Sequence, residues 1–279
     1  MSRPRSRSRG RRGRVKACVI TGFGINADEE LALAFGMAGA DARRVHVRDL
    51  IEEPGAIFAY RILAFPGGFS FGDHLGSGKV FAALFRRALG RATRDFVSGG
   101  GLVIGICNGF QVLVKMGALP NLSGSWDQEV SLIHNDSGRF EDRWVRVAFE
   151  KESPCAWTRG LPDMDLPVRH GEGKFVVRSL EVLEALKGRK LVALRYAAEE
   201  GPAGAEVPYP ADPNGSVEHI AGICDPTGRV FGLMPHPEAY IYAENHPDRS
   251  FGAHGPVGMT PGLRIIAGGV RAAAEAGPY

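Results

Sequence analysis

Short apolar runs alternate with helical patterns along the first 116 residues, and this alternation constrains the fold more than any other feature of the sequence. The apolar runs predict strands at about residues 16–21, 43–47, 61–65 and 102–104. The helical patterns predict helices at about residues 28–38, 79–89 and 109–116, with a further helix ending near 97. Strand–helix alternation at this spacing predicts an α/β fold, in which helices cover both faces of a mostly parallel sheet.

Three glycine-rich segments, Gly22–Gly24, Pro66–Gly68 and Gly105–Gly109, each follow one of these predicted strands. In open parallel sheets, ligands bind beyond the carboxyl ends of the strands. We therefore expect the functional site at the edge of the sheet where the three segments meet.

The second half of the chain is rich in predicted strands. Apolar runs lie at residues 145–149, 191–196, 220–224 and 230–234. The segment Asp225–Arg229 has the composition of a hairpin turn between the last two. Residues 199–216 are predicted to form a long surface loop, and a final helix to span about 262–276. Because no internal repeat is visible, we expect one domain over residues 16–279.

The excess positive charge of the chain is confined to its amino-terminal segment. Seven arginines and Lys16 lie in the first 16 residues, and removing these eight charges from the formal net charge of +3 leaves −5 for residues 17–279. The segment has no apolar stripe, so we expect residues 1–15 to form a disordered basic tail. An organellar transit peptide and a nucleic-acid-binding arm are the alternatives for an Arg-rich leader without acids.

Other targeting and metal-binding features are not evident in the sequence. It has no secretory segment and no apolar stretch near 18 residues, so we expect a cytoplasmic protein without a membrane or nucleic-acid partner. The four cysteines are far apart and form no C-x-x-C pair, so neither a zinc site nor a disulfide framework is expected. Any cysteine chemistry would come from a single thiol.

One cysteine stands in a segment suited to nucleophilic catalysis. Gly105-Ile-Cys-Asn-Gly109 lies between a predicted buried strand and a predicted helix, as the thiol counterpart of the G-x-S-x-G elbow. The flanking glycines remove Cβ atoms that would clash in such a sharp turn. The helix N-terminus favours a thiolate and offers backbone N–H groups to an oxyanion. We predict that Cys107 is a nucleophile rather than a buried structural cysteine.

A cysteine nucleophile needs a base, and the base needs an orienting group. Among the eight histidines, His236 follows a predicted strand and stands in Met234-Pro-His-Pro-Glu238. The prolines favour an extended backbone, which would project residues i and i+2 to the same side. We predict that Glu238 holds the imidazole while His236 faces the sulfur.

These motifs resemble the triad-type (class I) glutamine amidotransferases, and most closely the glutaminase subunits of phosphoribosylformylglycinamidine synthases. Further segments similar to signatures of that family are Pro66-Gly-Gly-Phe-Ser-Phe-Gly-Asp73, Asn135-Asp-Ser-Gly-Arg-Phe140, His170-Gly-Glu-Gly173, Asp212-Pro-Asn-Gly-Ser216 and Gly232-Leu-Met-Pro-His-Pro-Glu238. They run from about residue 66 to 238, in the family's order.

The resemblance implies a flavodoxin-like domain that hydrolyses glutamine and passes ammonia to a synthetase subunit, where formylglycinamide ribonucleotide is amidated. It implies no cofactor in this subunit, with ATP and Mg²⁺ on the synthetase, and a small accessory subunit is a further possible partner. Residue by residue, it assigns the catalytic triad, backbone oxyanion donors and substrate contacts. The triad would be Cys107, His236 and Glu238. The oxyanion donors would be the backbone N–H groups of Gly68 and Asn108, and the substrate contacts would be Gln111, Asn135 and Phe140.

The chain departs from the family's pattern at two motif positions. Ala27 stands where a cysteine is usual, and Ala239 follows Glu238 where arginine is common. Neither belongs to the triad. The chain is also longer than is usual for the family in residues 199–211, beyond residue 240 and in the tail. The sequence therefore does not determine where the partner subunit would bind. His170, Glu172 and Lys174 are consistent either with a solvated loop or with a position near the site.

Two other functions remain as alternatives. A Cys-elbow hydrolase or glyoxalase-like protein would commonly place its histidine beside the cysteine, where this chain has Asn108. A non-catalytic scaffold would be expected to lose at least one of Cys107, His236 and Glu238, and all three are present.

Overall fold

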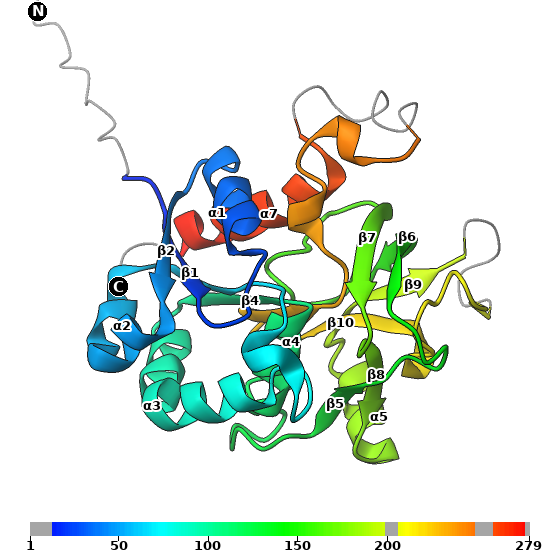
Figure 1. Ribbon diagram of the computed structural model, residues 1–279, viewed down its shortest axis with the longest axis horizontal. Coiled ribbons are helices and arrows are strands. Elements are labelled where there is room, and N and C mark those ends of the chain that lie inside the picture. Colours follow the sequence, from blue (N-terminus) through cyan, green and yellow to red (C-terminus); the bar gives the residue numbers. More distant parts are fainter. Residues whose placement is uncertain (1–12, 199–205, 249–258, 277–279) are drawn as a thin grey trace, which may run out of the picture.

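The computed structural model describes residues 13–198, 206–248 and 259–276, and most of them form one large sheet with helices on both faces (Figure 1). The predicted tail lies outside the described residues up to position 12, and so does the 199–205 part of the predicted loop. Val15, at the end of the predicted tail, already packs against the core, and its carbonyl accepts from the Asp41 N–H.

The large sheet has nine strands in the order β2-β1-β3-β4-β11-β10-β9-β6-β7. The first five are mutually parallel, and the remaining pairs are antiparallel. In that order the strands span Asp41–His46, Lys16–Thr21, Ile62–Phe65, Leu102–Ile106, Val230–Leu233, Ile220–Cys224, Val192–Ala197, Glu141–Phe149 and Met164–His170. The predicted α/β class and the strand-rich second half are confirmed.

Helices cover the two faces of the parallel half. α1 (Asp28–Met37) packs on α7 (Pro261–Glu275) on one face. α2 (Val47–Glu52), α3 (Lys79–Ser98) and α4 (Asn108–Lys115) share the other face, as Figure 1 shows. A second sheet pairs β5 (Val130–Ile133) with β8 (Lys174–Val177), followed by α5 (Leu180–Gly188). No helix in the described part of the chain is both long and apolar enough to cross a membrane.

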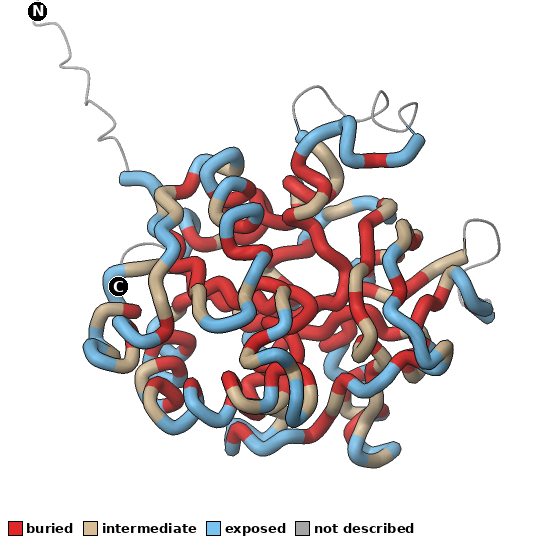
Figure 2. Tube along the Cα trace, viewed as in Figure 1, coloured by how far each residue is buried: buried red, intermediate tan, exposed pale blue. Residues whose placement is uncertain are grey.

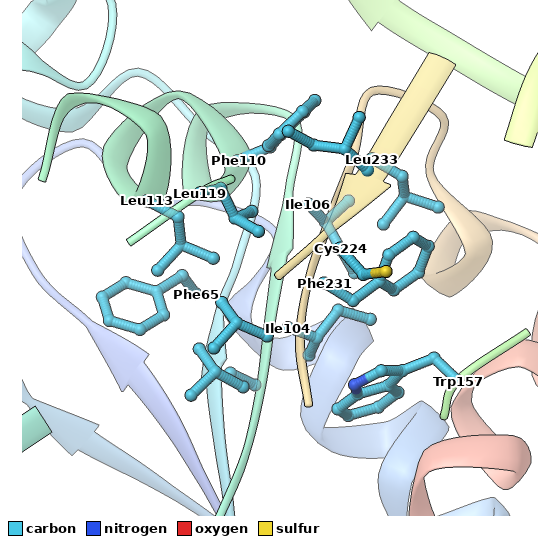
Figure 3. Close-up of a cluster of buried hydrophobic side chains, with 14 of the residues drawn as sticks. Phe65, Ile104, Ile106, Phe110, Leu113, Leu119, Trp157, Cys224, Phe231 and Leu233 are labelled. Atoms are coloured by element: carbon cyan, nitrogen blue, oxygen red, sulfur yellow. The ribbon is translucent and has the colours of Figure 1, made fainter. Parts of the chain in front are cut away.

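The central parallel strands are buried on both faces, as covered parallel strands are expected to be. Every residue of β3, β4 and β11 is buried (Figure 2). Figure 3 shows the resulting core, in which Ile104 and Ile106 of β4 lie beside Phe231 and Leu233 of β11. This packing fixes the relative positions of the loops that leave the carboxyl ends of these strands.

Residues 79–98 form one helix, whereas the sequence predicted a helix to 89 and a separate one beyond it. Phe81, Phe85, Leu89, Thr93 and Phe96 recur every three or four residues and are all buried. This continuous stripe offsets the roughly 1 kcal/mol that Gly90 costs within a helix.

The prediction of a surface loop over 199–216 is wrong at its carboxyl end, because Asp212, Asn214 and Ser216 are buried. The Asp212 carboxylate accepts the N–H groups of residues 214 and 215. The Asn214 amide donates to the Gly173 carbonyl. These bonds satisfy the polar groups of the loop internally, so it can lie against the second sheet rather than in solvent.

Close packing at the start of α4 makes Gly109 a test of this fold. A Cβ at Gly109 would lie 1.9 Å from the Phe65 carbonyl oxygen, whereas a Cβ at the helical, exposed Gly36 would meet nothing within 4 Å. We expect Gly109→Ala to lower the free energy of unfolding by about 3 kcal/mol. Gly36→Ala should raise it by up to about 1 kcal/mol. Chemical denaturation measures both, and equal effects would contradict the packing.

Candidate active site

A cavity of about 260 Å³ lies at the carboxyl ends of the parallel strands, as predicted, and two of the three glycine-rich segments contribute Gly68 and Cys107 to its lining. The third segment meets the second beside it, where the Gly24 carbonyl accepts from the Phe69 N–H. Ala27 follows β1, Gly68 follows β3, Cys107 follows β4 and His236 follows β11, and all four line the cavity. Residues 169–172, at the end of β7, also line the cavity. The site also adjoins the point where the strand order reverses, because β1 is flanked by β2 and β3.

The turn between β4 and α4 has the geometry of a nucleophile elbow. Cys107 adopts φ 51° and ψ −107°, a backbone conformation that L-residues rarely adopt. A Cβ at Gly105 would lie 2.6 Å from the Gly109 carbonyl oxygen, so both flanking glycines are required by close backbone approach. The Cys107 N–H donates to the Leu233 carbonyl over 2.8 Å. This strained turn presents the sulfur to the cavity, as the sequence predicted.

The structure brings His236 and Glu238 together as a buried pair. The imidazole Nδ1 lies 2.6 Å from Glu238 Oε1, and the two side chains are 5% and 0% exposed. The backbone differs from the predicted extended run, because Pro237–Ala239 is a single 3₁₀ turn. The turn still lets Glu238 reach back to the ring two residues before it.

The imidazole of His236 is also held by its surroundings. Its backbone N–H donates to the Pro167 carbonyl of β7 over 2.8 Å. A Cβ at Gly67 would lie 2.8 Å from His236 Cε1, so the glycine after β3 lets the backbone approach the ring. β3, β7 and β11 therefore fix the ring jointly.

The charges of this cluster determine its protonation. Burial on its own lowers the pKa of His236, but the negative charges of Glu238 and of the Cys107 thiolate outweigh it and raise the pKa from 6.5 to about 10. Nε2 of this ring is buried and makes no hydrogen bond. At neutral pH the ring is therefore an imidazolium, the form that can protonate a leaving group.

Of the two predicted oxyanion donors, Gly68 lines the cavity and Asn108 follows Cys107 directly at the start of α4. Gly68 adopts φ 150°. A Cβ added at this position would lie 2.7 Å from the Gly24 carbonyl oxygen. The Asn108 N–H is the first of α4 and so has no acceptor within the helix. The Asn108 side chain accepts from the Ser70 N–H and donates to Gln111 Oε1. The donor role of both N–H groups stays a prediction.

Two of the three predicted substrate-binding residues line the cavity, and the third is buried behind it. Gln111 lines the cavity, where its Nε2 donates to the Glu172 carbonyl over 2.6 Å. Phe140 forms part of the rim; it is 52% exposed, and its ring centroid lies 6.2 Å from that of Phe69. Asn135 does not line the cavity. It is buried behind His170, so we revise its expected role from substrate contact to support.

The structure places at the cavity two residues for which the sequence left open either a solvated loop or a position near the site. His170, at the end of β7, is 2% exposed and lines the cavity with Glu172, so the polar-loop interpretation does not hold for His170. The carbonyl oxygen of Arg169 lies 3.6 Å from Cys107 Sγ. His170-Gly-Glu-Gly173 was the available signal, but its position depends on pairing between distant strands.

The cysteines other than Cys107, at positions 18, 155 and 224, are free and buried in the core. In the described ranges, no group of three or more His, Cys, Asp or Glu side chains is placed to hold a metal ion. Of the described cysteines, Cys107 alone lines the cavity, and His236 lines it too.

Comparison with known proteins is consistent with this geometry. Residues 14–270 match the family described as CobB/CobQ-like glutamine amidotransferase domain. The phosphoribosylformylglycinamidine synthase subunit of Dehalococcoides mccartyi is 41% identical over 92% of this chain and 97% of its own length. The same subunit of Methanococcus maripaludis is 42% identical over 84% of this chain and 85% of its own. A chain in the structure of PurLQS from Thermotoga maritima superposes with a TM-score of 0.66 at 28% identity, covering 93% of this chain and 99% of that one.

Removing the carboxylate behind His236 tests the electrostatics of the site. Glu238→Gln deletes the largest contribution that raises the pKa, so His236 should titrate well below the wild-type value of about 10. NMR titration of labelled imidazole resonances measures this. Glu172→Gln, which removes another carboxylate that lines the cavity, is the matched control and should leave the titration of His236 unchanged. The same midpoint for His236 in both variants would refute the assigned cause.

Proposed function

Because the chain belongs to the glutamine amidotransferase family, we propose that it hydrolyses glutamine to glutamate and ammonia with Cys107 as nucleophile, His236 as acid and base, and Glu238 as the orienting group. The ammonia goes to a synthetase subunit that converts formylglycinamide ribonucleotide to formylglycinamidine ribonucleotide. This reaction belongs to de novo purine biosynthesis.

One observation carries the proposal: Cys107, on its strained elbow, lines the same small cavity as His236, and Glu238 is buried against the His236 ring. The thiolate attacks the side-chain amide carbon and forms a C–S bond, while the carbonyl oxygen becomes an oxyanion. Backbone N–H groups of Gly68 and Asn108 stabilise that oxyanion. As the intermediate collapses, the C–N bond breaks and His236 transfers its Nε2 proton to the departing nitrogen.

Hydrolysis of the thioester completes the cycle. The imidazole left neutral by the first step takes a proton from water, and the resulting hydroxide attacks the acyl carbon. The C–S bond then breaks, which restores the thiolate and the imidazolium. Glu238 keeps Nδ1 protonated throughout, so the same ring nitrogen serves both steps.

The names of the relatives support the choice of partner, because the two curated proteins compared above are subunits of phosphoribosylformylglycinamidine synthase. We place ATP and Mg²⁺ on the synthetase, since the sequence has no G-x-x-x-x-G-K-[ST] segment for a nucleotide. A small accessory subunit is a further expected partner. Ala27 lines the cavity without a thiol, and the triad does not require one there.

Glutamate release from glutamine tests the proposal, measured with the cognate synthetase subunit, ATP and formylglycinamide ribonucleotide. Cys107→Ala should abolish essentially all release, because no other described cysteine lines the cavity. Cys18→Ala, which removes a buried thiol from β1, is the matched control and should remain active.

Ammonium salts should still support nucleotide amidation by the Cys107→Ala complex, because that variant loses only its ammonia source. No glutamate release by the wild-type complex would sink the glutaminase proposal and favour a non-catalytic scaffold.

A further inference from the structure

The end of β7 lies against both members of the proposed acid–nucleophile pair. The Arg169 carbonyl oxygen lies 3.6 Å from Cys107 Sγ, and the Pro167 carbonyl accepts from the His236 N–H. The next side chain along the strand, His170, is 2% exposed and lines the cavity. His170 therefore stands at the reacting end of the cavity, and the mechanism above does not use it.

Asn135 fixes which nitrogen of His170 carries hydrogen. Its Nδ2 donates to the Arg139 and His170 carbonyls, so the amide orientation is determined and Oδ1 is an acceptor. Oδ1 also accepts the Gly173 N–H, and it lies 3.1 Å from His170 Nδ1. An acceptor facing Nδ1 requires hydrogen on that nitrogen, so Nε2 carries the lone pair.

The lone pair on Nε2 has no partner in the described chain. Nε2 is buried and makes no hydrogen bond. A buried polar atom without a hydrogen-bond partner lowers the stability of the folded protein by about 1–3 kcal/mol. Burial, and then repulsion from His236, lower the pKa of His170 to about 3, so the ring stays neutral at physiological pH. Nε2 can only accept a hydrogen bond.

Building on the glutaminase function proposed above, we propose that His170 Nε2 accepts a hydrogen bond from the side-chain carboxamide N–H of bound glutamine. The leaving nitrogen must lie close to His236, which protonates it, and His170 borders the same end of the cavity. The bond turns the nitrogen lone pair of the intermediate toward the imidazolium. No covalent bond at His170 forms or breaks.

The same contact discriminates substrate from product. A carboxamide offers two N–H donors, whereas the carboxylate of glutamate offers only lone pairs to an acceptor. An unprotonated Nε2 therefore favours glutamine and disfavours glutamate, because a site built to accept an N–H leaves its own acceptor unpaired against a ligand without one. His170 is thus a specificity-determining residue.

Two substitutions separate the two nitrogens. Asparagine carries its amide nitrogen on Cγ, as histidine carries Nδ1, so His170→Asn can keep the bond to Asn135 while losing the acceptor. Glutamine carries its amide on Cδ, so His170→Gln restores an acceptor near the place of Nε2. The substrates are glutamine and the γ-methyl ester of glutamate, whose leaving group has no N–H.

The experiment measures kcat/KM in the complex with the synthetase. His170→Asn should lose roughly tenfold with glutamine and less than about threefold with the ester, and His170→Gln should recover part of the loss. Equal losses with both substrates, or no loss with glutamine, would overturn this inference alone. Wild-type complex that hydrolyses neither substrate would overturn the proposed function with it.

A spectroscopic measurement covers the case in which the His170 variants do not fold. In Cys107→Ala protein, glutamine should move the His170 Nε2 nitrogen resonance, and the γ-methyl ester should not. A resonance that does not respond to saturating glutamine, or that responds equally to both ligands, would overturn the proposal.

Discussion

The whole site depends on the close approach of two backbone segments where β4 passes into α4. The Phe65 carbonyl occupies the space that a side chain at Gly109 would need, and the Gly109 carbonyl occupies the space beside Gly105. Because these contacts leave no room to relax, the residue between the glycines takes a left-handed conformation and presents its sulfur to the cavity. The buried core in Figure 3 makes this arrangement rigid. Backbone packing, more than any side-chain contact, positions the nucleophile.

A buried imidazolium is the second requirement, and the fold meets it with few partners. Removing an ion from water costs several kcal/mol unless an opposite charge compensates. Glu238 provides that charge at 2.6 Å. Glu238 Oε2, His236 Nε2 and His170 Nε2 are nevertheless buried without hydrogen bonds. Such unsatisfied atoms are uncommon in folded proteins. Two of the three belong to His170 and His236, which line the cavity, and this is typical of a site that completes its hydrogen bonds with a ligand.

The elbow and the pair could be predicted from sequence because their signals are local. Gly105 to Gly109 follows a buried strand directly, and His236 and Glu238 are two residues apart. The expected extended backbone was wrong at 237–239, yet a 3₁₀ turn joins the same two side chains. The parallel half of the sheet followed from periodicity for the same reason, since each strand and its helix are adjacent in the chain.

The support around the site could not be predicted in this way. β7 contains Pro167, and its sequence shows no clear alternation of apolar and polar residues. The proline is tolerated because β7 is an edge strand of the sheet. The bonds from Asn135 to His170 cross 35 residues and depend on that strand. The buried loop at Asp212 likewise satisfies its polar groups through its own turn, which its polar and proline-rich composition does not reveal.

The central claim is that Cys107 attacks the side-chain carbonyl carbon of glutamine. A chloroketone analogue of glutamine places an electrophilic carbon next to that position, and peptide mass spectrometry locates the adduct. The account predicts one adduct per chain, on the peptide that contains Cys107, formed more slowly when glutamine is present. An adduct on Cys18, Cys155 or Cys224 instead, or labelling that glutamine does not slow, would contradict it.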